Sequence, residues 1–242
     1  MQPERGKDCM NYIKELLFPR RCPVCDGIVK IGEGKICERC ETKLIPITEK
    51  WCLKCGKPLK QEEREYCRDC VRRNHVFVRG RAVFAYDNRA ESVYRFKYRG
   101  RQEYAEYYGE MSATVLAEEK EFQCAEALIP VPLHYSRQRK RGYNQAALFA
   151  RKLGEIWKIP VEEEIVIRKR NTKPLKQLNP LERQNNLKKA FKIVQNDVKL
   201  NTIILVDDIY TTGSTIDAVA RVFSDIGVRK IYFVTIAVGK GF

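Results

Sequence analysis

Residues 203–215 read IILVDDIYTTGST, and this stretch decides how the whole chain is interpreted. Four apolar residues that favour strands lead into Asp207 and Asp208. A turn of small hydroxyl residues around Gly213 follows, and then a helical pattern begins. This order predicts a buried strand whose carboxyl end carries two acids, followed by an anion-binding turn at the positive end of a helix.

The two acids and the turn suit a phosphorylated sugar. Neighbouring carboxylates repel each other unless they share a ligand, such as a ribose diol or a Mg²⁺ ion. The candidate ligand-binding residues are Asp207, Asp208, Thr211, Thr212, Gly213, Ser214 and Thr215. The plainer alternative is a strand, an acidic turn and a Ser/Thr helix cap. The stretch resembles the phosphoribosyl pyrophosphate (PRPP) signature of type I phosphoribosyltransferases, in which the acids hold the ribose 2′ and 3′ hydroxyls and the turn holds the 5′-phosphate.

Length and charge limit the classes of protein that fit. The 242 residues have room for one large domain, or for a medium domain with a small module. No apolar run approaches the ~20 residues of a membrane span, and the first residues do not form a secretory signal, so we expect a cytoplasmic protein without a membrane span. The net charge of +15 favours a polyanionic partner such as nucleic acid, or an anionic membrane surface. Binding of phosphate-rich ligands alone is the weaker alternative.

The cysteines form an internal repeat. Eight of the ten lie in four CxxC pairs: Cys22 and Cys25, Cys37 and Cys40, Cys52 and Cys55, Cys67 and Cys70. Without an export signal this spacing predicts two structural Cys₄ zinc sites rather than disulfides, with an iron–sulfur cluster as the minor alternative. The spacing favours sequential over interleaved pairing but does not decide between them. We expect the remaining Cys9 and Cys124 to be small buried residues, His75 to be a surface residue, and neither histidine to be a catalytic base.

The rest of the chain alternates strands with helices. The predicted strands are Val76–Tyr86, Ala125–Leu133, Ile165–Ile167, Thr202–Asp207 and Lys230–Val238. The predicted helices are Ala90–Ala117, Tyr143–Trp157, Leu181–Ala190 and Thr215–Ile226. This alternation predicts an α/β domain with a mostly parallel sheet flanked by helices, over residues 76–242. Residues 1–75 are predicted to hold an N-terminal helix and the small, cysteine-rich double zinc ribbon.

Basic segments follow two of the predicted strands, so they should emerge at the ligand-binding edge of the sheet. The nucleic-acid or pyrophosphate candidates on these loops are Arg137, Arg139, Lys140, Arg141, Asn144, Gln145, Arg168 and Arg170. The first segment is expected to be a mobile loop. Tyr135, Tyr143 and Tyr210 are candidates for base stacking, with simple packing as the alternative. Lys97, Arg99 and Arg101 form a further basic patch that we expect to be solvated.

These motifs together resemble the ComF family. The matching residues are Pro130–Leu133, Arg137, Arg141, Gly142, Asn144, Gln145, Arg168, Arg170, Thr172, Gln177, Arg183, Asn186 and the signature from Asp207 to Thr215. The resemblance implies a type I phosphoribosyltransferase core behind a zinc finger, and a role with single-stranded DNA during natural transformation. It places Val131 and Pro132 near the pyrophosphate of PRPP and its Mg²⁺. The doubled cysteine pattern departs from a single zinc finger.

Three hypotheses follow. The first is a PRPP-binding protein of DNA uptake, with single-stranded DNA and a helicase-like competence protein as partners. The second is a metabolic phosphoribosyltransferase in which an unidentified amine or base displaces pyrophosphate; catalysis by positioning and charge neutralisation needs no dedicated acid or base, and none is assigned. The third is a PRPP-sensing nucleic-acid-binding regulator. Type I enzymes bind their acceptor under a variable hood, and we expect the zinc module, together with Val76–Tyr107, to cover the site in this way.

Overall fold

The computed structural model describes residues 16–43, 45–60, 65–86, 90–169, 190–194 and 199–239. Its centre is a four-stranded sheet with the order β1-β6-β5-β2. Every neighbouring pair in this sheet is parallel. The strands are β1 (Arg79–Ala85), β2 (Ala127–Pro130), β5 (Thr202–Tyr210) and β6 (Lys230–Val238). The predicted parallel sheet flanked by helices is thus confirmed.

The two central strands owe their position to their apolar composition. Residues 231–238 of β6 are all buried, and β5 is buried from Ile203 to Val206. Successive side chains point to opposite faces of a sheet, so one strand supplies both cores. Ile203 and Leu205 belong to the core on one face, and Ile204 and Val206 to the core on the other.

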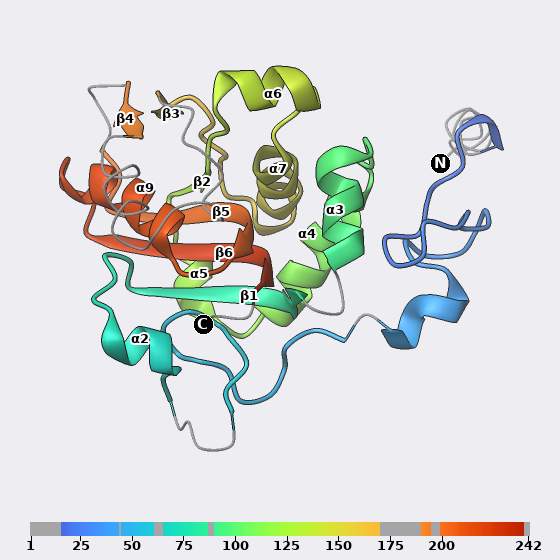
Figure 1. Cartoon of the computed structure of the whole chain (residues 1–242), viewed down its shortest axis with the longest axis horizontal. Helices are drawn as coiled ribbons and strands as arrows, with labels where there is room; N and C mark the ends of the chain where they lie inside the picture. The colour runs from blue at the N-terminus through green and yellow to red at the C-terminus, as the bar shows by residue number, and fades with distance from the viewer. Residues whose placement is uncertain are drawn as a thin grey trace, which may run out of the picture.

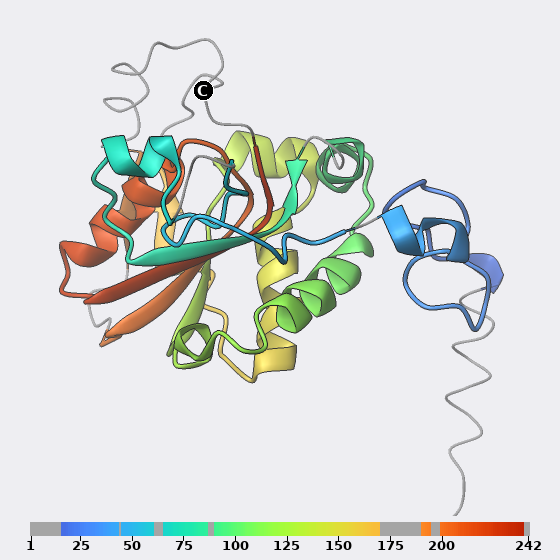
Figure 2. The same ribbon diagram turned by 90° about the horizontal axis from the view of Figure 1, so that it is seen from below.

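Helices cover both faces (Figures 1 and 2). Helix α9 (Ser214–Ser224) packs one face, with Ile216, Val219 and Phe223 in the core. The opposite face is covered by α4 (Tyr104–Val115), α5 (Lys120–Gln123) and α7 (Gln145–Trp157). Helix α7 begins after Asn144, whose side chain caps it by accepting a hydrogen bond from the N–H of Ala146. None of the helices found in the described ranges has the length and apolar surface that a bilayer span requires.

Two predicted segments form different secondary structure from that expected. The helical pattern over Ala90–Ala117 is divided into α3 (Ala90–Tyr98) and α4. Gly100 lies between them with φ of 69°, a left-handed conformation that ends a helix. The basic segment predicted as a loop forms a helix, α6 (Tyr135–Arg141), with His134 as its N-cap and Gly142 at φ of 85° after its last residue.

The predicted strand Ile165–Ile167 does not join the parallel sheet. Strand β3 (Val166–Arg168) pairs antiparallel with β4 (Phe191–Ile193) in a separate two-stranded sheet. An isolated bridge between His134 and Arg168 connects this small sheet to the start of α6. The candidates Arg170, Thr172, Gln177, Arg183 and Asn186, and nearly all of the predicted helix Leu181–Ala190, lie outside the described residues.

The internal repeat of the sequence is also a repeat of structure. Bridges join Arg21 to Ile28 in the first ribbon and Trp51 to Pro58 in the second. The first ribbon then continues into a 3₁₀ helix, η1 (Glu38–Lys43), and the second into α2 (Arg68–Arg72). The first ribbon lies at one end of the molecule beside α3 and α4, whereas the second lies along the edge strand β1 (Figures 1 and 2).

Candidate phosphosugar site and zinc centres

The two acids lie near the carboxyl end of β5, where the sequence places them. Asp208 is 5% exposed. Its Oδ1 atom is 2.8 Å from the Nζ atom of Lys97, and its Oδ2 atom accepts a hydrogen bond from the side chain of Gln145. Asp207 accepts a hydrogen bond of 2.8 Å from the N–H of Asp208. Asp208 is therefore held by a cation and an amide, whereas Asp207 accepts a backbone hydrogen bond.

The electrostatics of the pair favour a ligand that supplies donors or positive charge. Burial raises the pKa of Asp207 to about 7, and the negative charge of Asp208 adds to the effect. Lys97, the N–H of Asp208 and Arg168 act in the opposite direction but do not cancel it. Hydroxyl groups that donate to a carboxylate stabilise its charged form. A ribose diol would provide such groups.

The turn that follows the acids has the form of an anion cradle. Gly213 has φ of 78°, and α9 begins at Ser214. The hydroxyls of Thr212 and Ser214 lie 2.9 Å apart. A Cβ atom on residue 213 would lie 2.6 Å from the Tyr210 hydroxyl oxygen and 2.9 Å from Cε1 of His75, so both the backbone angle and the space require glycine. Hydroxyls and helix N–H groups at a positive helix end suit a phosphate. We call Thr211–Thr215 the phosphate loop.

The segment predicted to lie near pyrophosphate is adjacent to the acids. The N–H of Val131 donates to the carbonyl of Val206 at 2.8 Å, directly before Asp207. The carbonyl of Val131 accepts a hydrogen bond of 3.1 Å from Asn144. Asn144 thus caps α7 and ties that helix to the segment of Val131 and Pro132. The two candidates Asn144 and Gln145 act here through internal hydrogen bonds.

Cations from both basic segments gather beside the acids. Burial lowers the pKa of Arg168, the charge of Arg137 lowers it further, and the charge of Asp207 opposes both effects. Arg141 donates to the side chain of Gln145, which in turn donates to Asp208. Arg139 and Lys140 are exposed on α6. The structure therefore links Arg141 to Asp208 through Gln145, and it places Arg168 within electrostatic range of Asp207 and of Arg137. Arg139 and Lys140 stay at the surface.

Several sequence expectations for single residues are wrong. Lys97, expected to be solvated, pairs with Asp208, and Arg101 pairs with Asp26 of the first ribbon at 2.7 Å. Helical spacing could have identified Lys97, because it lies four residues after the buried Val93. Cys124 is exposed rather than buried, and the side chain of His75 is 1% exposed rather than on the surface.

The three tyrosines that were candidates for base stacking differ in their exposure. Tyr135 is 71% exposed. Tyr143 is buried and donates its hydroxyl to the carbonyl of Phe96. Tyr210 is buried and stacks on Phe233 with ring centroids 4.8 Å apart. Two of the three tyrosines, Tyr143 and Tyr210, are thus part of the packing.

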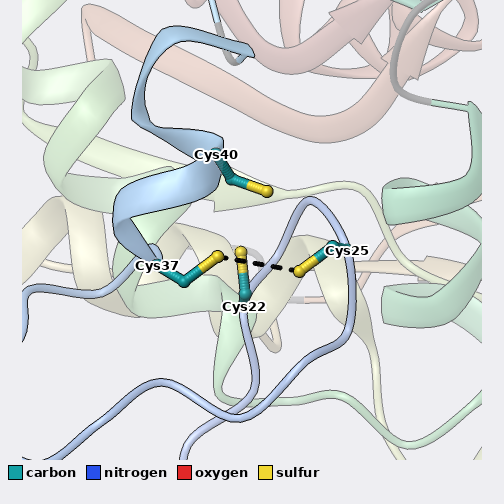
Figure 3. A group of neighbouring side chains, drawn as sticks. All are labelled: Cys22, Cys25, Cys37 and Cys40. Carbon is teal, nitrogen blue, oxygen red and sulfur yellow. Dashed lines mark hydrogen bonds between the residues drawn. The ribbon is translucent and has the colours of Figure 1, made fainter.

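The cysteines converge in two sets, and the pairing is sequential. Their sulfur atoms lie within 4.8 Å of one another in each set, which are Cys22, Cys25, Cys37 and Cys40, and Cys52, Cys55, Cys67 and Cys70. In the first set the side chains point toward a common centre (Figure 3). Four thiols at this separation match the tetrahedral shell of zinc and leave no position for a substrate. These are two structural zinc sites. Cys9 lies outside the described residues.

The two zinc ribbons are connected to the phosphosugar site through different contacts. Arg73, just after the second ribbon, donates to the carbonyl of Thr212 at 3.1 Å. The first ribbon contacts α3 and α4, and α3 carries Lys97 to Asp208. The second ribbon thus reaches the site at the phosphate loop, and α3, which lies within Val76–Tyr107, reaches it at Asp208. That the zinc module covers the site stays a prediction.

Comparisons with known proteins agree with this architecture. The model of the family described as a double zinc ribbon domain matches residues 13–71, and that of the phosphoribosyl transferase domain matches residues 139–241. The chain is 33% identical to competence protein ComFC of Bacillus subtilis, over 81% of this chain and 80% of the relative. It is 29% identical to competence protein F of Haemophilus influenzae, over 88% of this chain and 95% of the relative. It is 26% identical to DNA utilization protein YhgH of Escherichia coli, over 89% and 96%. The chain belongs to the ComF family and joins a double zinc ribbon to a phosphoribosyltransferase domain.

Proposed function

We propose that this protein binds PRPP with Mg²⁺ and acts with single-stranded DNA in the cytoplasm during DNA uptake. The observation that carries the proposal is the order of groups along β5 and α9. Asp207 and Asp208 precede a hydroxyl-rich turn that is closed by a glycine and ends at a helix N-terminus. A diol-binding pair followed at once by a phosphate cradle suits a 5-phosphorylated ribose.

The pyrophosphate of PRPP fits the cations around the acids. Arg168 is close enough to Asp207 and to Arg137 for its charge to interact with both. A bound polyanion would place opposite charge beside these two cations. Mg²⁺ bound to the pyrophosphate would neutralise further charge. The segment of Val131 and Pro132 lies beside the same acids through its hydrogen bond to Val206.

A nucleic-acid surface adjoins this site on α3 and α6. Tyr94 and Tyr98 are 49% and 60% exposed, and their ring centroids are 5.0 Å apart. The guanidinium of Arg141 lies 4.8 Å from the ring centre of Tyr98. The two helices lie side by side in both views of the molecule (Figures 1 and 2). Exposed aromatic rings beside cations suit single strands, whose bases stack while their phosphates pair with Arg and Lys. The bases of a duplex are already stacked on one another, so these exposed rings would contribute little to duplex binding.

The names of relatives support a role in DNA uptake. Two of them are competence proteins and one is a DNA utilization protein, and each alignment spans most of both chains. A helicase-like competence protein is the partner that we propose for a strand entering the cell. The alternatives are a metabolic phosphoribosyltransferase with an amine or base as acceptor, and a PRPP-sensing regulator that binds duplex DNA or structured RNA.

Fluorescence anisotropy over a salt series, with and without PRPP and Mg²⁺, tests the proposal. We expect single-stranded DNA to bind more tightly than duplex DNA, with a steep dependence on salt. Replacing Tyr94 and Tyr98 by alanine should weaken single-strand binding about tenfold. Replacing Arg139 and Lys140 by alanine should reduce the salt slope for single-stranded DNA by about 1.4, which is about 0.7 for each cation. The matched control replaces Arg229 and Lys230, which are exposed at the opposite end of the sheet.

The outcomes separate the hypotheses. Equal effects of the α6 and control variants would contradict the surface on α3 and α6. Preference for duplex DNA would favour the regulator. PRPP binding without any DNA binding at moderate salt, together with pyrophosphate release in the presence of an amine or base, would establish the metabolic transferase instead.

A further inference from the structure

We propose that the second zinc ribbon is part of the phosphosugar site, and that Arg73 and His75 position the phosphate loop for the 5′-phosphate. This inference rests on the proposed function, because it assumes that Thr211–Thr215 receives a phosphate. It assigns a binding role to a zinc ribbon that was expected to be purely structural and to His75, which was expected at the surface.

Arg73 brings a positive charge to the loop. It follows α2 directly, and α2 carries the zinc ligand Cys70. Its Nη1 atom donates to the carbonyl of Thr212 at 3.1 Å. A guanidinium has five N–H donors in a fixed fork, so one contact with a carbonyl leaves others for a phosphate oxygen. The residue is exposed, which lets it carry its charge without a desolvation cost. Thr212 is the residue directly before Gly213 in the loop.

His75 fixes the helix that begins at the loop. Its Nδ1 atom is 2.7 Å from Oδ2 of Asp217, and the N–H of Val76 donates to Oδ1 of the same side chain at 2.9 Å. Asp217 lies in the first turn of α9. Both of its oxygens are thus used by the segment that leaves the second ribbon. This clamp sets the position of α9 relative to the ribbon.

The histidine ring also lies directly against the loop. Its Cε1 atom would be 2.9 Å from a Cβ on residue 213. The ring stacks on Phe77 with centroids 4.6 Å apart. Its Nε2 atom is buried and makes no hydrogen bond to any described residue. The orientation of the ring therefore depends on Asp217 and Phe77, and a change at residue 217 would release it beneath Gly213.

Zinc links these contacts to the core. Cys52, Cys55 and Cys67 belong to the same apolar cluster as Tyr210 and Ile216, which flank the loop. Helix α2 has only five residues and is too short to be stable without the metal. The positions of Arg73 and His75 thus depend on the second zinc site.

Isothermal titration of the full-length, zinc-loaded protein with ribose 5-phosphate, PRPP and pyrophosphate tests the inference. Arg73→Ala should weaken binding of ribose 5-phosphate and PRPP about tenfold and leave pyrophosphate binding unchanged. Arg73→Lys should restore part of the loss, because it keeps the charge and loses the fork. Arg72→Ala is the matched control, since this exposed neighbour has the same charge and no contact with the loop is recorded for it. Equal affinities for the Arg73→Ala and Arg72→Ala variants would overturn the inference, and so would an equal loss for pyrophosphate.

A second measurement separates this inference from the proposed function. Hydrogen exchange of residues 211–217 should become faster in Asp217→Asn than in the wild type, with both zinc ions retained by metal analysis. If wild-type protein binds neither PRPP nor ribose 5-phosphate, the proposed function fails. The structural link is then judged by exchange alone, and unchanged exchange in Asp217→Asn would overturn it.

Discussion

The two zinc ribbons have the same ligand spacing and the same turn between their first two ligands, yet they join the protein in opposite ways. The first has a small core of its own, formed by Cys22, Val29, Cys37 and Cys40. It is anchored through polar contacts, since Asp26 accepts from Arg101 at 2.7 Å and 3.0 Å and from the hydroxyl of Tyr104 at 2.7 Å. The second shares the core of the sheet.

One pair of equivalent positions shows how this difference arises. Asp26 and Gly56 both follow the second ligand of their ribbon, with φ of 60° and 71°. Asp26 can use its carboxylate because α4 and the segment before it provide a cation and a hydroxyl. A Cβ on residue 56 would lie 2.6 Å from the backbone nitrogen of Ala82, so β1 leaves room only for hydrogen. The same backbone turn thus serves as a polar anchor in one ribbon and as a close packing contact in the other.

The largest expected difference follows from removing each metal. Replacing Cys52 and Cys55 by serine should abolish the cooperative unfolding transition, because a structural zinc site contributes on the order of 10 kcal/mol and this one is built into the core. Replacing Cys22 and Cys25 should leave the transition of the core in place. Circular dichroism and zinc content, one ion per chain in each variant, check the result. Equal losses of stability would show that the ribbons are not different in this respect.

Exchanging the residues at the equivalent turn tests the comparison more finely. Gly56→Asp should cost at least about 4 kcal/mol, because it creates a steric clash with Ala82 and buries a charge. Asp26→Gly should cost about 1 kcal/mol, the value of a partly exposed ion pair with one added hydrogen bond. Urea unfolding measures both. A larger cost for Asp26→Gly would reverse our account of the two ribbons.

A pH series extends the comparison to the phosphosugar site. The first ribbon contacts α3, which carries Lys97 to Asp208, and the second ribbon leads to Arg73 at the phosphate loop. An acid whose pKa is raised on folding costs stability as it ionises. For Asp207 the cost should develop between pH of about 4 and about 7 and persist above it. Asp207→Asn keeps the oxygen that accepts from Asp208 and should stabilise the protein by about 2 kcal/mol at pH 8, within the limit of about 4 kcal/mol set by the shift. At pH 4 the gain should vanish. Melting temperatures of both proteins across this range provide the measurement, and a gain that is constant with pH would contradict the raised pKa.

The smallest effect is expected at the polar anchor of the first ribbon. Partial burial opposes ionisation of Asp26, but hydrogen bonds from Arg101 and Tyr104 outweigh it and lower the pKa. Stability from this contact is therefore present above pH of about 4 and is lost as the pH falls through the lowered value. Arg101→Ala should cost about 1 kcal/mol at neutral pH and expose the first ribbon to limited proteolysis. Unchanged cleavage in this variant would show that Arg95, through the carbonyl of Val24, suffices as an anchor.

Local sequence patterns predicted much of the fold. Strand β6 has the predicted bounds Lys230–Val238, and α9 and β5 differ from prediction by a few residues. Such elements are long, strongly patterned and bounded by glycine or polar residues, so short-range rules suffice. Antiparallel pairing of β3 with β4 was missed because a three-residue strand has no pattern that names its partner. The helix α6 was missed because its seven residues are nearly all polar and have no apolar period.

The sequence by itself determined that eight cysteines form two zinc sites, and it determined the order of acids, turn and helix in the phosphosugar motif; the structure decided that the cysteines pair sequentially. Local backbone geometry is enough for two cysteines three residues apart to bind one ion. It is also enough to place the acids at the end of a strand next to the glycine turn that follows. Only the tertiary structure decided that Lys97 pairs with Asp208, that His75 clamps Asp217, and that the second ribbon rather than the first contacts the phosphate loop. These contacts join residues between 111 and 142 positions apart, or place one of two equivalent repeats against a sheet edge. No local pattern distinguishes them, because the choice depends on which surface has room and opposite charge.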